Sequence, residues 1–439
     1  MTADAPRRPL SPLERWYWIL DRISPLNAVA RVHVGARIEP DALRRAADAL
    51  AAAHPLLRVA VRTDADGAHP RFVPTDAPLG IRRVEGDADT WSREVDGHEL
   101  AHGLDTETGP LARILHVDTG DGADLVLVAA HIVVDGRGAL ALLRSLVRAV
   151  HAEQTGAGAR LAAGTVVEPP EDRLPARFRG GLGTARAVLG MLGGEARVAV
   201  RRPRRLPAEQ QVAWARRRTR LLRRSLGPDE LERLRAACAA HGVTVHGVLG
   251  VALAEAVGAE LGPGRDGTLT VGCPVDFRDR LTPPVGPEEL GAYVAALPVA
   301  VGYGPGADPW RTAARINTDL RARIAADTDL AVITGLRLLS PVSVARADRA
   351  ARTVEQRGPG NVCLSNMGRF DMPSAVGDWP VSGTQTAAGL SLSGYLVAVA
   401  NTSHGTLFWN FTYIEGVVPA ARAARIADHA LRRLRGLSA

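Results

Sequence analysis

Apolar residues recur along the first third of the chain with two spacings, one typical of helices and one typical of strands. The first helix opens with a capping signal, because Ser11 precedes Pro12 and Glu14 follows three residues after Ser11. The next helix should stop before Pro55, since proline disfavours helical backbone in the preceding residue. Helices are predicted at 11–22, 39–54 and 136–153, and strands at 27–38, 112–118 and 123–131.

The same kinds of pattern return in the second half of the chain. Helices are predicted at 227–242, 244–261 and 419–437, and strands at 267–278, 289–303, 360–370, 391–405 and 406–416. Between the halves, residues 156–224 are rich in Pro, Gly and Arg and show weak periodicity. We therefore predict an N-terminal lobe at 1–155, an interlobe crossover at 156–224 and a C-terminal lobe at 225–439, with helices and a sheet in each lobe.

Composition adds limits to this picture. The chain has 439 residues, enough for two cores, and 46% of them are hydrophobic, which is a globular composition. Aromatic residues make up only 4%, which argues against a nucleic-acid binder that stacks bases on aromatic side chains. The net charge is +7, and every basic residue is arginine. Arginine without lysine, beside abundant Ala and Gly, is typical of a GC-rich genome, so the charge is weak evidence about function.

Cysteine usage and the N-terminus predict a cellular location. Cys238, Cys273 and Cys363 lie far apart and form no CxxC motif, so we expect reduced core cysteines. The first ten residues lack the apolar segment of a signal peptide. No apolar run reaches the roughly 18 residues of a membrane helix. These features predict a cytoplasmic protein without a membrane span.

Chemistry concentrates in the stretch AAHIVVDGRG, residues 129–138. A short apolar strand places His131 at its end, and Gly136 and Gly138 permit a tight turn before the next helix. Imidazole titrates near neutral pH, so His131 is a candidate general base. Asp135 has two possible roles: it orients the His131 ring, or it turns away and pairs with an arginine that fixes the loop. By pattern alone, a strand-capping histidine and an Asp-Gly turn explain the stretch equally well.

The stretch 131–136 and five further segments in order resemble one superfamily, which holds chloramphenicol acetyltransferase, the condensation domains of nonribosomal peptide synthetases and the polyketide-associated acyltransferases of mycobacteria. Residues 131–136 resemble its HxxxDG motif. The other similar segments are LSPLERWYWI (10–19), AAAHPLLRVAVR (51–62), CPVDFRDRL (273–281), ELGAYVAALPV (289–299) and LSNMGRF (364–370). The resemblance implies an α/β fold of two similar chloramphenicol-acetyltransferase-like lobes in a V, with a central channel.

The resemblance also implies roles for single residues. His131 matches the catalytic histidine, the general base. Asp135 matches the aspartate of a structural salt bridge, with Arg58 and Arg278 as the two candidate partners. Gly136 matches the glycine that keeps the channel floor open.

Ser365 falls in a strand similar to the one whose serine helps to bind the oxyanion in chloramphenicol acetyltransferase, and a structural serine is the alternative. One departure is Ala130, where many members have a second histidine. The plant-type DFGWG segment and a carrier-attachment serine are both absent, so a free-standing enzyme is expected. Metal-binding HExxH, P-loop and dinucleotide motifs are absent as well, and no metal is predicted.

The implied reaction moves an acyl group from a thioester to an acceptor. The co-substrate would be acyl-CoA or acyl-phosphopantetheine, with no permanently bound cofactor, and the leading product is an ester of a small-molecule alcohol in secondary-metabolite or lipid biosynthesis. The alternatives are an amide-forming condensation enzyme of natural-product assembly and a non-catalytic member that binds an acyl or peptidyl carrier protein. The arginine-rich stretch 197–224 is either a site for an acidic carrier protein or CoA phosphates, or a solvated linker. No nucleic-acid partner is expected.

Overall fold

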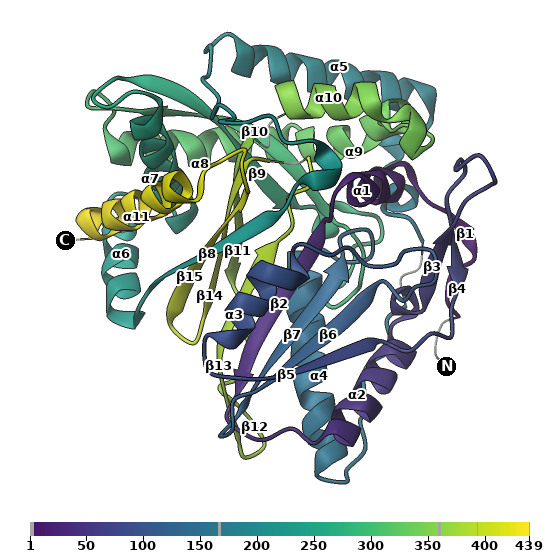
Figure 1. Ribbon diagram of the computed structural model, residues 1–439. Helices are drawn as coiled ribbons and strands as arrows, with labels where there is room; N and C mark the ends of the chain where they lie inside the picture. The colour runs from purple at the N-terminus through teal and green to yellow at the C-terminus, as the bar shows by residue number, and fades with distance from the viewer. Residues whose placement is uncertain (1–3, 166–167, 359–360, 393, 439) are drawn as a thin grey trace.

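Two six-stranded sheets organise the computed structural model, which describes residues 4–165, 168–358, 361–392 and 394–438 (Figure 1). The first sheet has the order β12-β13-β2-β7-β6-β5, and the second has the order β10-β9-β11-β14-β15-β8. The strands of the first sheet are β2 (Asn27–Val34), β5 (Gly80–Glu85), β6 (Ala112–Asp118), β7 (Ala123–Ala130), β12 (Ala375–Val376) and β13 (Trp379–Ala388). The strands of the second are β8 (Thr219–Leu226), β9 (Gly267–Asp276), β10 (Val294–Tyr303), β11 (Val362–Arg369), β14 (Leu396–Ser403) and β15 (Thr406–Ile414).

Helices cover the sheets, and a small third sheet lies at one side of the molecule. The helices are α1 (Pro12–Ile23), α2 (Pro40–Ala53), α3 (Thr90–Glu94), α4 (Gly136–Gln154), α5 (Gly180–Ala199), α6 (Pro228–Ala240), α7 (Val245–Leu261), α8 (Pro309–Ala325), α9 (Thr328–Leu339), α10 (Asp348–Arg357) and α11 (Ala420–Leu437). The small sheet joins β1 (Arg8–Pro9), β4 (Arg71–Pro74) and β3 (Val59–Arg62). Figure 1 shows α2 and α4 beside the first sheet, and α6, α7 and α11 beside the second.

The two lobes repeat one arrangement. In the first, β2 leads to α2, β5 pairs with β6 in parallel, and the β6–β7 hairpin leads to α4. In the second, β8 leads to α6, β11 pairs with β14 in parallel, and the β14–β15 hairpin leads to α11. The predicted pair of similar α/β lobes is confirmed by this correspondence. Each lobe has its own hydrophobic core, which includes Leu127 and Leu143 in the first and Leu253 and Trp409 in the second.

Several elements differ from the sequence predictions. The strand β13 belongs to the C-terminal half of the chain but pairs with β2 in the first sheet, so chain order and spatial lobes diverge at this point. The crossover holds the 20-residue helix α5 and, at its end, the first residues of β8. Helices α8, α9 and α10 were not predicted. Residues 360 and 393, inside two predicted strands, and residues 166–167, inside the crossover, lie outside the described residues.

Other predictions are confirmed. Ser11 caps α1 in the expected way, accepting a hydrogen bond from the Glu14 amide while the Glu14 carboxylate accepts one from the Ser11 amide. The three cysteines are free and buried. Among the described residues no single helix is long and apolar enough to cross a membrane, although the consecutive helices α6 and α7, bent by 102°, would suffice together in length and composition.

Candidate active site

The strand β7 carries the HxxxDG segment to the meeting point of the two lobes. All eight residues of β7 are buried, and Asn27 of β2 pairs with Ala130, the last residue of β7. His131 is the next residue, and its amide donates to the carbonyl of Leu26 over 3.2 Å. Asp135 is the N-cap of α4, with its side chain accepting from the amide of Gly138. The loop between strand and helix is therefore fixed at both ends.

The His131 ring is held by an aromatic neighbour that sequence reasoning missed. Tyr17 of α1 stacks on it, with 4.7 Å between ring centroids and 5° between ring planes. The Nδ1 atom is buried and bonds to no other residue of the described chain, whereas the His131 side chain as a whole is half-buried. Burial lowers the pKa of His131, and the negative charge of Asp135 opposes that effect in part. The imidazole is therefore neutral at pH 7 and able to accept a proton.

Asp135 binds the C-terminal lobe rather than the His131 ring. Its carboxylate receives hydrogen bonds from both terminal nitrogens of Arg278, at 2.7 and 3.1 Å, and from the amide of Tyr293 at 3.1 Å. Both Asp135 and Arg278 are buried. A bidentate guanidinium–carboxylate pair has a defined geometry, so it fixes the loop relative to β9 and β10. Of the two alternatives for Asp135, the structure shows the arginine pair.

Electrostatics keep this buried pair charged. Burial alone would raise the pKa of Asp135, but the charge and hydrogen bonds of Arg278 outweigh it, and the pKa lies below its usual value. For Arg278, burial is again opposed by Asp135, and the pKa is raised. Arg278 also donates to Asp276 over 3.2 Å and lies over the Tyr293 ring, 4.5 Å from its centroid. Removing either partner would leave an uncompensated charge in the interior.

Arg58, the other candidate partner, lies elsewhere. It follows the short helix Pro55–Leu57 and precedes β3, whereas the Asp135 carboxylate is bound by Arg278 and by backbone amides. A further link between the lobes is the bridge that Val134 forms with Gly291. The loop that carries His131 is therefore joined to the segment between β9 and β10 by both backbone and side-chain contacts.

Gly136 begins α4 and lies against Met367 of β11, the strand that also carries Ser365. A Cβ added at Gly136 would lie 2.6 Å from Cε and 2.8 Å from Sδ of Met367, so the glycine leaves room for that side chain. Ser365 stands two residues before Met367 on the same strand and is buried. The strand β11 of the second lobe thus faces the start of α4 in the first.

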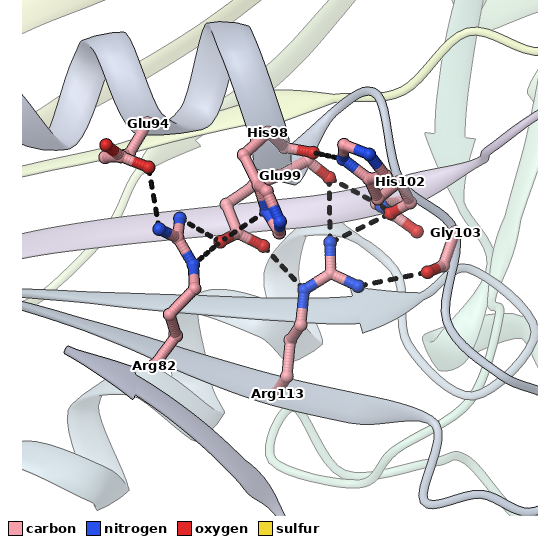
Figure 2. Close-up of polar contacts among 8 residues, drawn as sticks. Arg82, Glu94, His98, Glu99, His102, Gly103 and Arg113 are labelled. Atoms are coloured by element: carbon pink, nitrogen blue, oxygen red, sulfur yellow. Dashed lines mark hydrogen bonds and ion pairs between the residues drawn. The ribbon is translucent and has the colours of Figure 1, made fainter. Parts of the chain in front are cut away.

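A second ionic cluster holds the segment that contacts the start of β2, the strand paired with the end of β7. Glu99 ends a π-helical turn, Val95–Glu99, and its buried carboxylate is bound by Arg113 of β6 and Arg82 of β5 (Figure 2). Burial would raise the pKa of Glu99, but Arg113 and Arg82 outweigh it and lower the pKa. The Asn27 side chain donates to the Glu99 carbonyl over 2.7 Å. Because Asn27 pairs with Ala130, this cluster supports the strand end that positions His131.

An apolar cavity of about 740 Å³ opens beside the Tyr17–His131 stack. Tyr17, Trp16 and Leu13 of α1 line one side of it. The remaining walls come from β10, α5, α9, α10 and the loop between α9 and α10. Tyr17 therefore has one face on the candidate base and also lines the cavity.

Sequence reasoning missed Tyr17, Met367 and Tyr293 as parts of the site. Tyr17 stands in the segment 10–19 that resembles the superfamily, but nothing in helical periodicity shows which ring of the Trp16–Tyr17–Trp18 run faces the histidine. Tyr293 contributes an amide, which any residue could supply. The described chain holds no group of three or more His, Cys, Asp or Glu side chains that could bind a metal ion.

The arginine-rich stretch is largely engaged inside the molecule. Arg217 pairs with Glu355, Arg223 donates to Asp89 over 2.6 Å, and Arg224 donates to Asp428 over 2.7 Å. Arg220 bonds to both Asp96 and Glu415. These contacts join β8 to neighbouring elements, and they favour the structural interpretation of this part of the stretch over a free binding surface.

Comparisons with known proteins agree with this geometry. The family described as phthiocerol/phthiodiolone dimycocerosyl transferase C-terminus matches residues 215–403. Phosphinothricin tripeptide synthetase PhsC of Streptomyces viridochromogenes is 30% identical over 165 residues, which make up 35% of this chain and 15% of that protein. The chain thus corresponds to only a small part of that curated relative.

Two solved structures share the fold over nearly the whole chain. The first condensation domain of the CDA synthetase has a TM-score of 0.74 at 17% identity, covering 99% of this chain and 97% of the other. Polyketide synthase associated protein 5 from Mycobacterium tuberculosis has a TM-score of 0.67 at 20% identity, covering 99% and 98%. The shared fold and the family match over residues 215–403 confirm the predicted resemblance to the CoA-dependent acyltransferase superfamily.

Proposed function

We propose that the protein is an acyltransferase that moves an acyl group from a CoA or carrier-protein thioester to an alcohol and forms an ester. One observation carries the proposal: a neutral, half-buried histidine stacks on Tyr17, and Tyr17 lines an apolar cavity of about 740 Å³. Family and fold fit acyltransferase and condensation domains of natural-product or lipid biosynthesis. The cavity is large enough for an aliphatic chain and is lined mainly by apolar side chains.

His131 would act as general base. Its Nε2 atom accepts the proton of the acceptor hydroxyl as the oxygen attacks the thioester carbonyl carbon. The tetrahedral intermediate then expels the thiolate, which takes a proton from the imidazolium. The stack with Tyr17 limits rotation of the imidazole, and the Asp135–Arg278 pair holds the loop. No covalent acyl-enzyme is needed in this route.

Ser365 and nearby backbone amides are the proposed donors to the oxyanion. Ser365 lies on β11, close in sequence to Met367, which contacts the start of α4. Preorganised donors aimed at a developing oxyanion are worth a few kcal/mol each. Because the Ser365 hydroxyl makes no hydrogen bond to another described residue, it would not have to break an internal bond to serve in this role.

Amide formation is the second candidate. The match to a peptide synthetase over 165 residues favours it. A neutral amine would also lose its proton to His131, so the base itself does not distinguish the two acceptors. In that case the donor would be a carrier protein, as an acyl or peptidyl carrier is expected to supply the thioester.

The test is thiol release from a panel of acyl-CoA donors of increasing chain length, with the wild-type chain and His131→Ala in parallel. Each donor is offered with matched alcohol and amine acceptors, and the product mass is measured. We expect release that depends on His131 and on an alcohol, with the alcohol gaining one acyl group. Transfer only to the amine would establish the second candidate. Silence with every CoA thioester and with acyl-loaded carrier proteins would overturn both and favour a non-catalytic binding protein.

A further inference from the structure

Among the described residues, the exposed large apolar side chains belong to two helices that pack against each other, α5 and α9, and to the residues that follow them. They are Leu182, Leu189, Leu192 and Val200 on the first element and Leu338, Leu339 and Val342 on the second. Soluble proteins rarely leave a contiguous apolar surface uncovered, and such a surface marks an interaction site. We call this set the apolar patch.

The helix α5 has the sequence of an interfacial helix. Leu182, Leu189 and Leu192 follow one another at spacings that return to the same side of a helix. The opposite side packs on α9, where a Cβ added at Gly335 would lie 3.6 Å from Sδ of Met191. The outer side therefore carries an apolar stripe of exposed leucines, with the exposed Arg186 one turn after Leu182. Figure 1 shows α5 at the edge of the molecule.

Positive charge surrounds this stripe. Arg186 lies on α5, Arg201 and Arg202 follow its end, and Arg346 and Arg349 line the 740 Å³ cavity. None of these five side chains has an ion-pair partner within the described ranges. The neighbouring acidic residue Asp348 is already bound to Arg352, over 2.7 Å. Leucines bordered by unpaired arginines are the composition of a helix that lies in the interface of an anionic membrane.

The patch is continuous with the cavity. Leu338, Leu339 and Val342 are exposed members of the patch and also line the cavity, and Met191 of α5 lines it from the other side. An aliphatic chain could therefore pass from the patch to the Tyr17–His131 stack along apolar side chains. A second copy of the chain would fit this face less well, because a symmetric contact would bring the same arginines against each other.

From these observations we infer that the apolar patch docks on an anionic lipid bilayer and that the cavity receives its aliphatic ligand from there. The inference goes beyond the proposed function, since binding to a bilayer requires no acyl transfer. If the proposed reaction holds, its substrate would be a membrane-borne lipid. The experiment below measures binding to vesicles and does not depend on acyl transfer.

The test is co-sedimentation of the full chain with phosphatidylcholine vesicles, with and without phosphatidylglycerol. The patch variant is Leu182→Glu with Leu189→Glu. The matched control is Ala236→Glu with Ala240→Glu, which adds the same charge at exposed positions of α6, away from the patch. Since all four positions are exposed, circular dichroism is expected to show the same fold in every variant. A third variant, Arg346→Gln with Arg349→Gln, tests the charge.

We expect the wild-type chain and the control to bind the anionic vesicles. The patch variant should bind them with an affinity at least about tenfold lower. The arginine variant should lose about fivefold per arginine, on anionic vesicles only. The inference is overturned if the wild-type chain binds neither vesicle. It is also overturned if light scattering shows that the wild type is a dimer and the patch variant a monomer, or if patch variant and control bind vesicles equally.

Discussion

The loops that follow β7 and β15 occupy equivalent places in the two lobes. Each leads from the second strand of a hairpin into a helix, α4 or α11, and the two loops have the same length. The amide of His131 donates to the carbonyl of Leu26, and the amide of Glu415 donates to the carbonyl of Arg218. Val133 and Val134 are buried in the first loop, and Val417 and Val418 in the second.

The residues that carry chemistry differ completely between these loops. His131 corresponds to Glu415, which is half exposed and pairs with Arg220. Asp135, a buried N-cap bound to the other lobe, corresponds to Pro419, which makes no side-chain cap. The repeated fold therefore supplies two strand ends of the same shape, and only the first carries a histidine and a buried ion pair that connects the two lobes. Shape alone does not make either end a catalytic site.

The largest effect on kcat is expected at His131, the first residue of the loop after β7. We expect His131→Ala to lower kcat by about 10²- to 10⁴-fold, the usual contribution of a general base. Glu415→Ala, at the equivalent position, should leave kcat unchanged, because that side chain lies on the surface of the other lobe. Steady-state kinetics with the best donor and acceptor measures both. Equal losses in the two variants would mean that His131 acts through the fold and not as a base.

The next largest effect is expected on the free energy of unfolding, through the buried Asp135–Arg278 pair. Arg278→Met leaves the Asp135 carboxylate buried without its partner, and we expect it to lower the free energy of unfolding by about 3–5 kcal/mol. The counterpart, Glu415→Gln, removes an exposed ion pair and should cost no more than about 1 kcal/mol. Chemical denaturation of both variants measures the difference. Similar small losses would show that the Asp135–Arg278 pair does not secure the loop.

The sequence predicted the strand and the helix on either side of the first loop. It did not predict the distant segments that pack against this loop. Local signals predicted β7, α4 and the cap of α1, because apolar spacing and capping residues act over a few positions. The choice of Arg278 over Arg58 depends on which distant segment reaches Asp135, and no local pattern encodes that. The strand β13 was missed because its polar and small residues gain their order from pairing with β2, and the helix α5 because its glycines weaken helical periodicity.

The pH dependence of activity sharpens the comparison further. The base must be neutral to accept a proton, and burial sets the pKa of His131 below the ordinary histidine value of about 6.5. Activity should therefore hold at mildly acidic pH and fall only below that value. Asp135→Asn removes the charge that raises this pKa, so the midpoint of kcat/KM against pH should move to lower pH. Glu415→Gln serves as the control and should leave the midpoint in place, and a midpoint above 6.5 in the wild type would contradict the assignment.

The smallest expected effect is at the first residue of each helix. Gly136→Ala would bring a methyl group against the end of the Met367 side chain, which is flexible and can turn aside. We expect a loss of kcat/KM below about tenfold, equivalent to the lower part of the 1–3 kcal/mol range for overpacking. The double variant Gly136→Ala with Met367→Ala should regain most of this loss, because the obstructing atoms are gone. Ala420→Gly, at the equivalent place in the second lobe, should leave kcat/KM unchanged and lower stability by no more than about 1 kcal/mol. If Met367→Ala fails to restore Gly136→Ala, the glycine serves the backbone of the loop rather than the space between the lobes.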